Sequence, residues 1–349
     1  MKLPDFPWDL LLPYGEKAKK FAGGFIDLSQ GTPVDPTPKF IQDAFIAAAD
    51  SPSYPLTIGT PQLRDAMRSW AIENLGVTGE FDVLPTIGSK EFVAWLPTFL
   101  QSKNVLYPKV AYPTYLVGSM IAGATSTAVD IDAANWPAAD LAWINSPANP
   151  TGQVQTAAEL TAVINWSRQN NAVVASDECY LSFSKDAKSI LSLAAGDNTN
   201  LLAVHSLSKR SNLAGYRAGF IVGDSKLIAQ IREIRKHAGM MVPLPVQKAM
   251  VAALSDKNHV IEQANKYQMR REVLKTALEK SGFKLKFSEA GLYIWCTRDE
   301  DCWSTVDWFA ERGVLVTPGI FYGESGSKFV RIALTATDQS IKQVSERIA

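Results

Sequence analysis

One lysine of this sequence lies among side chains that bind phosphate. Lys209 follows the hydroxyl-rich turn 206–208, and Arg217 comes eight positions later. A lysine amine can form a Schiff base with an aldehyde, while hydroxyl groups and the planar guanidinium of an arginine are good phosphate ligands. The spacing therefore predicts a site for a phosphorylated aldehyde, in which Ser206 and Arg217 hold the phosphate and Lys209 reacts with the carbonyl group.

Other polar residues fit the ring of pyridoxal phosphate, the cofactor that this chemistry suggests. A carboxylate at Asp177 would keep the pyridine nitrogen protonated, which makes the ring an electron sink. Asn149 and Tyr180 can hydrogen-bond the phenolic oxygen of the ring. Tyr112 could stack on the ring face. If Lys209 carries this cofactor, the reaction concerns the carbon–nitrogen bonds of amino acids.

A second set of phosphate ligands is predicted where a strand-like run ends and a helix begins. Ser89 and Lys90 follow the run 81–87 through Gly88. Free backbone amides at a helix N-terminus, together with the helix dipole, favour a phosphate group. Taken singly, the candidate residues have structural alternatives: a helix cap at Ser89, a turn at Asp177 or Asn149, core packing at Tyr112 and a surface position for Lys209. Their combination favours the cofactor site.

The elements that must position these residues form an alternating pattern. From about residue 35 to residue 235, short apolar runs alternate with stretches of helical period such as 157–169. The runs that we interpret as buried strands are 104–108, 141–145, 172–176, 201–205 and 218–222. Continuous apolar strands suit a sheet that is covered on both faces. The pattern predicts a doubly wound α/β domain, with the candidate residues at the carboxyl ends of its strands.

The character of the sequence changes beyond residue 236. A long helical stretch covers about 244–281, with a break near 255–258. Strand-like segments follow at 292–295, 314–316 and 329–333. We predict a large domain over 35–235 and a smaller α+β domain made of 1–34 and 236–349.

Composition excludes several classes of protein. The 35 basic and 35 acidic residues cancel, which argues against a nucleic-acid or anionic-membrane partner. The three cysteines are too few for a disulfide framework or a zinc site, so no metal is expected. Residues 1–13 do not have the pattern of a signal peptide, and no apolar run approaches the roughly 20 residues that cross a bilayer. We expect a cytoplasmic protein.

With these residues placed, the chain resembles the class I/II aminotransferases, which are fold type I enzymes that use pyridoxal phosphate. The motifs that carry the resemblance are Ser-Pro-Ala-Asn-Pro-Thr-Gly at 146–152, Asp-Glu-Cys-Tyr at 177–180 and Ser-Leu-Ser-Lys at 206–209. The resemblance implies a seven-stranded, mainly parallel sheet in the large domain. It implies that Lys209 carries the cofactor and moves the substrate proton, and that the phosphate ligands are Ser89, Lys90, Ser206 and Arg217.

Three further residues match the family pattern. Arg331 matches the arginine that binds the substrate α-carboxylate, and a bidentate fork suits that planar anion. Gly31 matches the glycine whose backbone meets the same carboxylate, and Asn149 lies beside it. Tyr54 matches a tyrosine that reaches the cofactor phosphate of the neighbouring subunit, which implies a homodimer with shared active sites.

Within the family, the chain most resembles the succinyldiaminopimelate aminotransferases of actinobacterial type. The similarity lies in the opening segment 3–9, in 31–38 and in 208–217. It implies transfer of an amino group from N-succinyl-LL-2,6-diaminopimelate to 2-oxoglutarate, which gives glutamate and N-succinyl-2-amino-6-ketopimelate, in lysine and diaminopimelate biosynthesis. Aminotransferases for another amino acid, such as aspartate or an aromatic one, and β-lyases are alternatives on the same scaffold.

Two questions stay open at this level. A non-enzymatic effector-sensing domain is a rival interpretation, and it predicts a DNA-binding module. We expect none, because the residues before Asp27 leave no room for such a module and the sequence has no basic patch. The candidates for the pocket that selects the substrate side chain are Tyr14, Met240, Met241, Leu292 and Tyr322, each of which could equally be a core residue.

Overall fold

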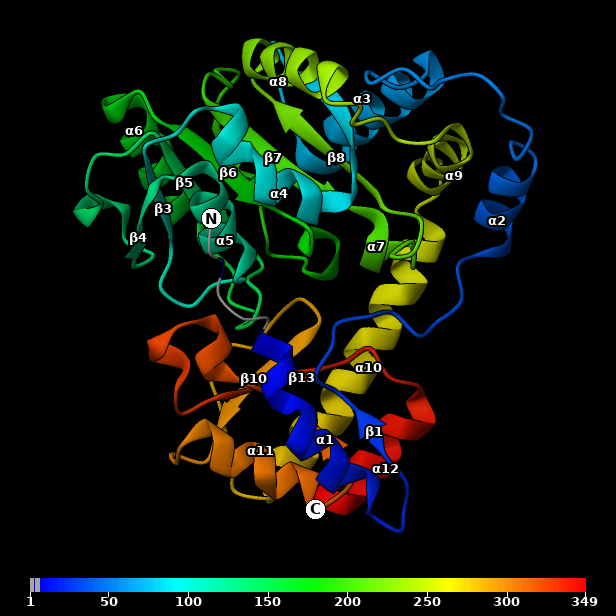
Figure 1. Ribbon diagram of the computed structural model, residues 1–349, viewed down its shortest axis with the longest axis vertical. Coiled ribbons are helices and arrows are strands. Elements are labelled where there is room, and N and C mark those ends of the chain that lie inside the picture. The colour runs from blue at the N-terminus through cyan, green and yellow to red at the C-terminus, as the bar shows by residue number, and fades with distance from the viewer. Residues whose placement is uncertain (1–2, 4–6) are drawn as a thin grey trace.

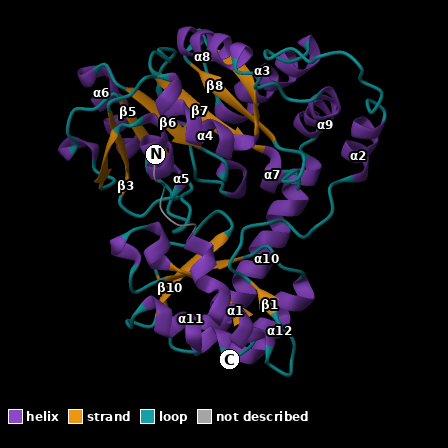
Figure 2. Ribbon diagram, in the orientation of Figure 1, coloured by secondary structure: helices purple, strands orange, loops and turns teal. Residues whose placement is uncertain are grey.

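The computed structural model describes residue 3 and residues 7–349. A seven-stranded sheet forms the centre of the upper lobe, as Figures 1 and 2 show. Its strand order is β2 (Asp82–Ile87), β8 (Ala218–Gly223), β7 (Leu201–Ser206), β6 (Val173–Asp177), β5 (Leu141–Asn145), β3 (Asn104–Pro108) and β4 (Thr125–Val129). Strand β8 is antiparallel to both neighbours and the other pairs are parallel. The predicted mainly parallel, seven-stranded sheet is therefore confirmed.

Helices cover both faces of this sheet. On one face, apolar side chains of α4 (Gly88–Phe99), α5 (Thr114–Ala122) and α8 (Ser225–His237) pack on the sheet around Trp143. On the other face, the layer consists of α2 (Lys39–Ile46), α3 (Pro61–Leu75), α6 (Ala157–Asn170) and α9 (Leu244–Ser255). Burial on both faces explains why the central strands are continuous apolar runs.

The lower lobe contains two small sheets and a second apolar core. One sheet has the order β12 (Thr317–Pro318), β13 (Val330–Ala333), β10 (Tyr293–Thr297) and β9 (Lys284–Leu285). In the other, β1 (Ile26–Asp27) pairs in parallel with β11 (Val314–Leu315). This pairing brings the N-terminal segment back to the C-terminal part of the chain. The helices here are α1 (Leu12–Lys19), α11 (Cys302–Ala310) and α12 (Asp338–Ile348).

A long helix, α10 (Asn258–Lys280), extends from beside the upper lobe into the lower one (Figure 1). It is separated from α9 by a break at Asp256 and Lys257, where the carboxylate of Asp256 accepts a hydrogen bond from the backbone N–H of His259. The predicted break near 255–258 is thus confirmed.

The domain limits at 35–235, and at 1–34 with 236–349, stay a prediction. One observation bears on them: α9 lies beyond residue 235, yet its buried residues belong to the core beneath the large sheet. The signal-peptide prediction for 1–13 rests partly on residues 1–2 and 4–6, which lie outside the described residues, as does part of the 3–9 similarity. In the described residues, no helix combines the length and apolarity that crossing a membrane requires.

Candidate active site

A cavity of about 490 Å³ lies where the carboxyl ends of the central strands face the lower lobe. Asp177 ends β6, Ser206 ends β7, and Asn149 lies in the loop that follows β5. The cavity is lined by every predicted site residue except Tyr54: Gly31, Ser89, Lys90, Tyr112, Asn149, Asp177, Tyr180, Ser206, Lys209, Arg217 and Arg331. Tyr54 is 92% exposed and lies in the loop before α3.

Asp177 is a buried carboxylate that is held by neutral donors. Its Oδ2 accepts from the Tyr115 hydroxyl at 2.8 Å and its Oδ1 accepts from the Cys179 backbone N–H at 3.2 Å. Burial raises the pKa of Asp177 above its ordinary value, although the hydrogen bonds from Cys179 and Tyr115 and the nearby amine of Lys209 act in the opposite direction. A carboxylate so placed fits a cationic ring N–H, whose charge would restore its ordinary ionisation.

Lys209 and the phosphate ligands lie on short, tightly turned segments. Lys209 is in α7 (Leu207–Arg210), whose N-cap is Ser206 with its hydroxyl accepting from the Ser208 backbone N–H at 3.1 Å. Gly88, at the start of α4, has φ +70°, and a Cβ there would lie 2.5 Å from Nη2 of Arg217. The absent Cβ leaves room for the guanidinium beside the amides of Ser89 and Lys90. This donor set fits a phosphate monoester.

Asn149 is positioned by a second asparagine. Asn145 Oδ1 accepts from the Asn149 backbone N–H at 2.7 Å, and Asn145 Nδ2 donates to the carbonyl oxygen of Asp177 at 2.8 Å. The loop after β5 is thereby fixed to β6. Tyr180 follows Asp177 by three residues in the sequence. Its hydroxyl lies 3.2 Å from the hydroxyl of Tyr293. Asn149 and Tyr180 both line the cavity, where the amide of one and the hydroxyl of the other could donate to the phenolic oxygen of the cofactor ring.

Arg331 joins the two lobes at the cavity. It is 3% exposed, its Nη1 donates to Asn149 Oδ1 at 3.0 Å, and its Nη2 donates to the carbonyl oxygen of Ser29. Its guanidinium carbon lies 4.1 Å from the centre of the Tyr293 ring. Within residue 3 and residues 7–349, Nε of Arg331 is buried without a hydrogen-bond partner. Because an unpaired buried donor is costly, this guanidinium fits an anionic ligand in the cavity.

Sequence reasoning missed several residues of the cavity wall. Tyr293 was predicted only as part of a strand, although it explains Gly31: a Cβ at that glycine would lie 2.2 Å from the Tyr293 hydroxyl oxygen. Cys179 lies within the 177–180 motif and could have been found there. The other lining residues without a predicted role are Pro7, Trp8, Gln30, Thr32, Ala94, Pro113, Thr114, Val117 and Ser208.

The five residues proposed from sequence for the side-chain pocket lie elsewhere in the described structure. Tyr14 stacks on Trp303, and Leu292 is fully buried in the lower core. Met240 packs at the edge of the upper core, and neither it, Met241 nor Tyr322 is among the cavity-lining residues. Helix α5, which was not predicted from the sequence, contributes Thr114 and Val117 to the described cavity wall.

Behind the cavity floor, Glu178 and His205 form a buried pair. Glu178 Oε2 lies 3.4 Å from His205 Nε2, and Glu178 Oε1 accepts from the Ile190 backbone N–H at 2.9 Å. Burial raises the pKa of Glu178 to about 7 and lowers the pKa of His205 to about 3. At neutral pH we therefore take the imidazole as neutral, with the carboxyl group holding a proton for much of the time.

The raised pKa of Glu178 predicts how the stability of the protein varies with pH. Between the ordinary value of 4.5 and about 7, the folded protein keeps a proton that the unfolded chain has lost. Stability contributed by this residue therefore falls as the pH rises through that window. In Glu178→Gln the fall is removed, so the unfolding free energy of the variant, relative to the parent, should increase from about pH 5 to about pH 8. Urea unfolding at several pH values measures this, and a constant difference would contradict it.

The fold and the cavity together define a pyridoxal-phosphate-dependent enzyme of fold type I. This conclusion rests on the mainly parallel sheet, the buried carboxylate of Asp177 at the end of one strand, Lys209 after the next strand, and the phosphate donors beside them. Residues 24–348 match the profile of the family "aminotransferase class I and II". The chain belongs to this family, and its cofactor is pyridoxal phosphate.

Several known proteins that are similar to the chain are named as aminotransferases or transaminases. The chain is 47% identical to the 4-dedimethylamino-4-oxo-anhydrotetracycline transaminase OxyQ of Streptomyces rimosus, over 99% of both chains. It is 48% identical to a probable aminotransferase of Mycobacterium tuberculosis, over 99% of this chain and 85% of that protein. A probable N-succinyldiaminopimelate aminotransferase from Thermus thermophilus superposes with a TM-score of 0.87 at 26% identity, over 98% of this chain and 99% of that one.

Proposed function

We propose that this aminotransferase acts on N-succinyl-LL-2,6-diaminopimelate and 2-oxoglutarate. The observation that carries the proposal is the number of cations in one cavity: Arg217, Lys209 and Arg331 are joined there by Lys90. The phosphate and one α-carboxylate account for two of these cations, and the third reacts. Both substrates carry a further carboxylate at the end remote from the reacting carbon, and we assign it to the side chain of Lys90, whose backbone amide is among the donors to the phosphate. The name of the Thermus relative supports the same substrate.

The cofactor, when bound, supplies an electron sink for the electrons of the substrate Cα–H bond. Asp177 maintains the charge that makes this sink effective. Once the amino group of the donor has displaced it, the Lys209 amine would take the proton from Cα and deliver it to the former aldehyde carbon of the cofactor, on the other side of the substrate nitrogen. Arg331 and the backbone at Gly31 hold the α-carboxylate, while Asn149 and Tyr180 orient the ring. Because one site serves both substrates in turn, ping-pong kinetics are expected, and a ternary-complex pattern would contradict this order.

We further propose a homodimer in cytoplasm, in which Tyr54 completes the phosphate site of the partner subunit. The support is that Tyr54 matches the family pattern yet is almost fully exposed in the single chain, as is much of Leu56 in the same loop. Sedimentation measures the state of assembly. A monomer with full activity would contradict the proposal.

Substitution of Lys90 tests the substrate class. Lys90→Gln should lower kcat/KM for donors with a remote carboxylate roughly two- to fivefold, the modest factor expected for an exposed cation. With alanine as donor, which has no remote carboxylate, the value should not change. Equal losses with both donors would show that the lysine serves the cofactor alone.

The direct assay offers N-succinyl-LL-2,6-diaminopimelate with 2-oxoglutarate and measures glutamate. A turnover no faster than that with aspartate or phenylalanine would reject the proposed substrate.

The similarity to OxyQ favours a second candidate, amination of a ketone on a polycyclic ring, and the apolar wall at Trp8 and Val117 suits such a ring. A lyase is tested with cystathionine: pyruvate released without an acceptor would reject transamination.

A further inference from the structure

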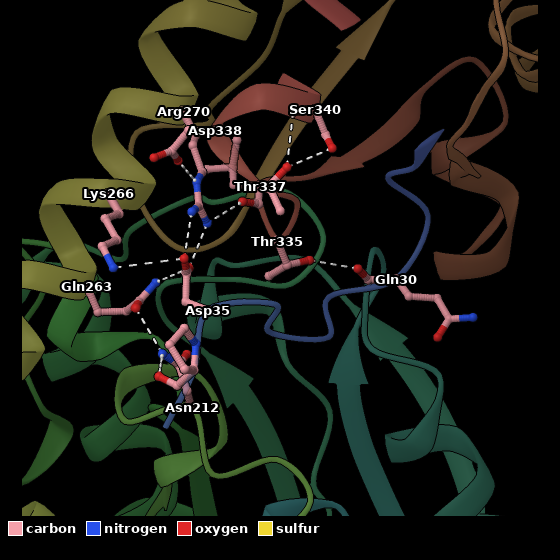
Figure 3. A network of polar contacts seen from close by, with 12 residues as sticks. Gln30, Asp35, Asn212, Gln263, Lys266, Arg270, Thr335, Thr337, Asp338 and Ser340 are labelled. Atoms are coloured by element: carbon pink, nitrogen blue, oxygen red, sulfur yellow. Dashed lines mark hydrogen bonds and ion pairs between the residues drawn. The ribbon is translucent and has the colours of Figure 1, made fainter. Parts of the chain in front are cut away.

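A continuous polar network connects helix α10 with two segments of the active site (Figure 3). We call residues 28–37 the strap, because Gln30, Gly31 and Thr32 of this segment line the cavity. We call residues 207–213 the lysine loop, because it carries Lys209. Side chains from successive turns of α10 contact both segments, although strap and lysine loop are about 180 residues apart in the sequence.

Gln263 is the junction of the network. Its Nε2 donates to Asp35 Oδ2 of the strap at 2.9 Å, and its Oε1 accepts from Asn212 Nδ2 of the lysine loop at 2.9 Å. Gln263 is only 4% exposed. Both ends of one buried amide are therefore engaged, one by each segment, and a displacement of either segment disturbs the bond to the other.

On the side of the lysine loop, Asn212 is held in an unusual conformation. Its φ is +55°, a left-handed value that is uncommon for residues other than glycine but is adopted by asparagine more often than by most. Asn212 Nδ2 also lies 3.3 Å from the carbonyl oxygen of Pro36, and the carbonyl oxygen of Asn212 accepts from the Thr37 hydroxyl at 2.8 Å. The strap thus contributes directly to the turn that follows Lys209. One turn before Gln263, His259 Nε2 lies 2.9 Å from the hydroxyl of Ser211.

On the side of the strap, Asp35 is fixed by a two-point ion pair. Arg270 Nη1 and Nη2 each donate to one oxygen of Asp35 at 2.8 Å, and Arg270 Nε donates to Asp338 Oδ1 at 2.6 Å. Burial alone would raise the pKa of Asp35, but the hydrogen bonds from Arg270 and Gln263 bring it below the ordinary value. Paired bonds of this kind fix orientation as well as distance.

We propose that Asp35 and Gln263 are positioning residues that couple the strap to the lysine loop. The placement of the Lys209 amine then depends on the position of the strap, whose residues Gln30 to Thr32 line the cavity where substrate binds. The inference rests on the proposed role of Lys209 and of the strap in binding, but it does not depend on which amino acid is the substrate. Coupling of this kind is reciprocal, so a displacement of either segment should change the position of the other.

Hydrogen exchange of the holoenzyme tests the coupling with Asp35→Asn. In the described part of the chain, the side chain of Asp35 has the polar partners Gln263, Arg270 and Lys266, and none of these belongs to the lysine loop. The proposal nevertheless predicts that amides of 207–213 exchange about tenfold faster in the variant, because a charge-assisted bond of the network is lost. It also predicts a shifted pH midpoint for the visible absorbance of the bound cofactor. Faster exchange confined to the strap would overturn the proposal.

Gln263→Leu gives a second, more direct test with a matched control. Gln268 lies on the same helix, is exposed, and bonds Glu272 at 2.7 Å. Gln263→Leu should speed exchange in both the strap and the lysine loop, raise KM for the amino donor and lower kcat about tenfold, the factor for one buried bond. Gln268→Leu should do none of these. Equal effects of the two variants would overturn the proposal.

Thr37→Val is the milder variant if Gln263→Leu does not fold. It removes the hydroxyl bonded to Asn212 at nearly constant shape, and should speed exchange of the lysine loop roughly threefold. Unchanged exchange of that loop would contradict the coupling. Rejection of N-succinyl-LL-2,6-diaminopimelate as substrate would leave all these exchange results standing, so a failure of the coupling and a failure of the proposed substrate are distinguishable.

Discussion

Lys209→Ala should lower kcat roughly 10⁴-fold or more, because it removes both the amine that holds the cofactor and the group that moves the substrate proton. The cofactor should still bind, since the contacts expected from Asp177, Ser89 and Arg217 do not involve the lysine. Single-turnover kinetics with excess amino donor, with bound cofactor measured by absorbance, separate the two effects.

The matched control is Lys226→Ala, which removes an exposed lysine at the start of α8, outside the cavity-lining set. It should leave both turnover and cofactor content unchanged. Turnover of Lys209→Ala within tenfold of the parent would show that another group carries out the proton transfer.

Arg331→Ala should lower kcat/KM for the amino donor roughly 10²- to 10³-fold, the cost of removing one partner from a buried, hydrogen-bonded charge pair. Arg331 is almost fully buried, and its Nε has no hydrogen-bond partner among the residues that the structure describes. Arg331→Lys should lose nearly as much, because an ammonium group cannot form two parallel bonds to a carboxylate. Steady-state kinetics over a range of donor concentrations measure both variants.

The control for Arg331 must account for its structural contacts with Asn149 and Ser29. Thermal unfolding of the variants shows whether loss of these contacts between the lobes destabilises the protein. Arg312→Ala, which removes a guanidinium stacked 3.7 Å over Trp308 in the lower lobe, should alter stability without altering kcat/KM. An Arg331→Lys variant with the kinetics of the parent would contradict the carboxylate role.

The sequence predicted the parts of the fold and site that depend on local pattern. Buried central strands such as β5 and β7 are continuous apolar runs, and the polar residue that follows each one reaches the same edge of the sheet. Edge strand β4, with the sequence Thr-Ser-Thr-Ala-Val and mostly exposed side chains, carries no such run and was not predicted.

The residues that sequence reasoning could not place are those brought in by tertiary contacts. Tyr115 bonds Asp177 from a helix 62 positions earlier, and Tyr293 meets Tyr180 from the other lobe. The network through Gln263 likewise joins three distant segments, and a buried glutamine in a long helix gives no sign of its partners. Only the folded arrangement shows these positions.

The central claim is that Lys209 carries the cofactor, and borohydride reduction of the holoenzyme tests it most directly. Reduction makes the bond between the lysine amine and the cofactor permanent, and peptide mass spectrometry then identifies the modified residue. Two lysines, Lys209 and Lys90, are among the described residues that line the cavity. We expect the added mass on the peptide that contains Lys209. Added mass on Lys90, with Lys209 unmodified, would contradict it.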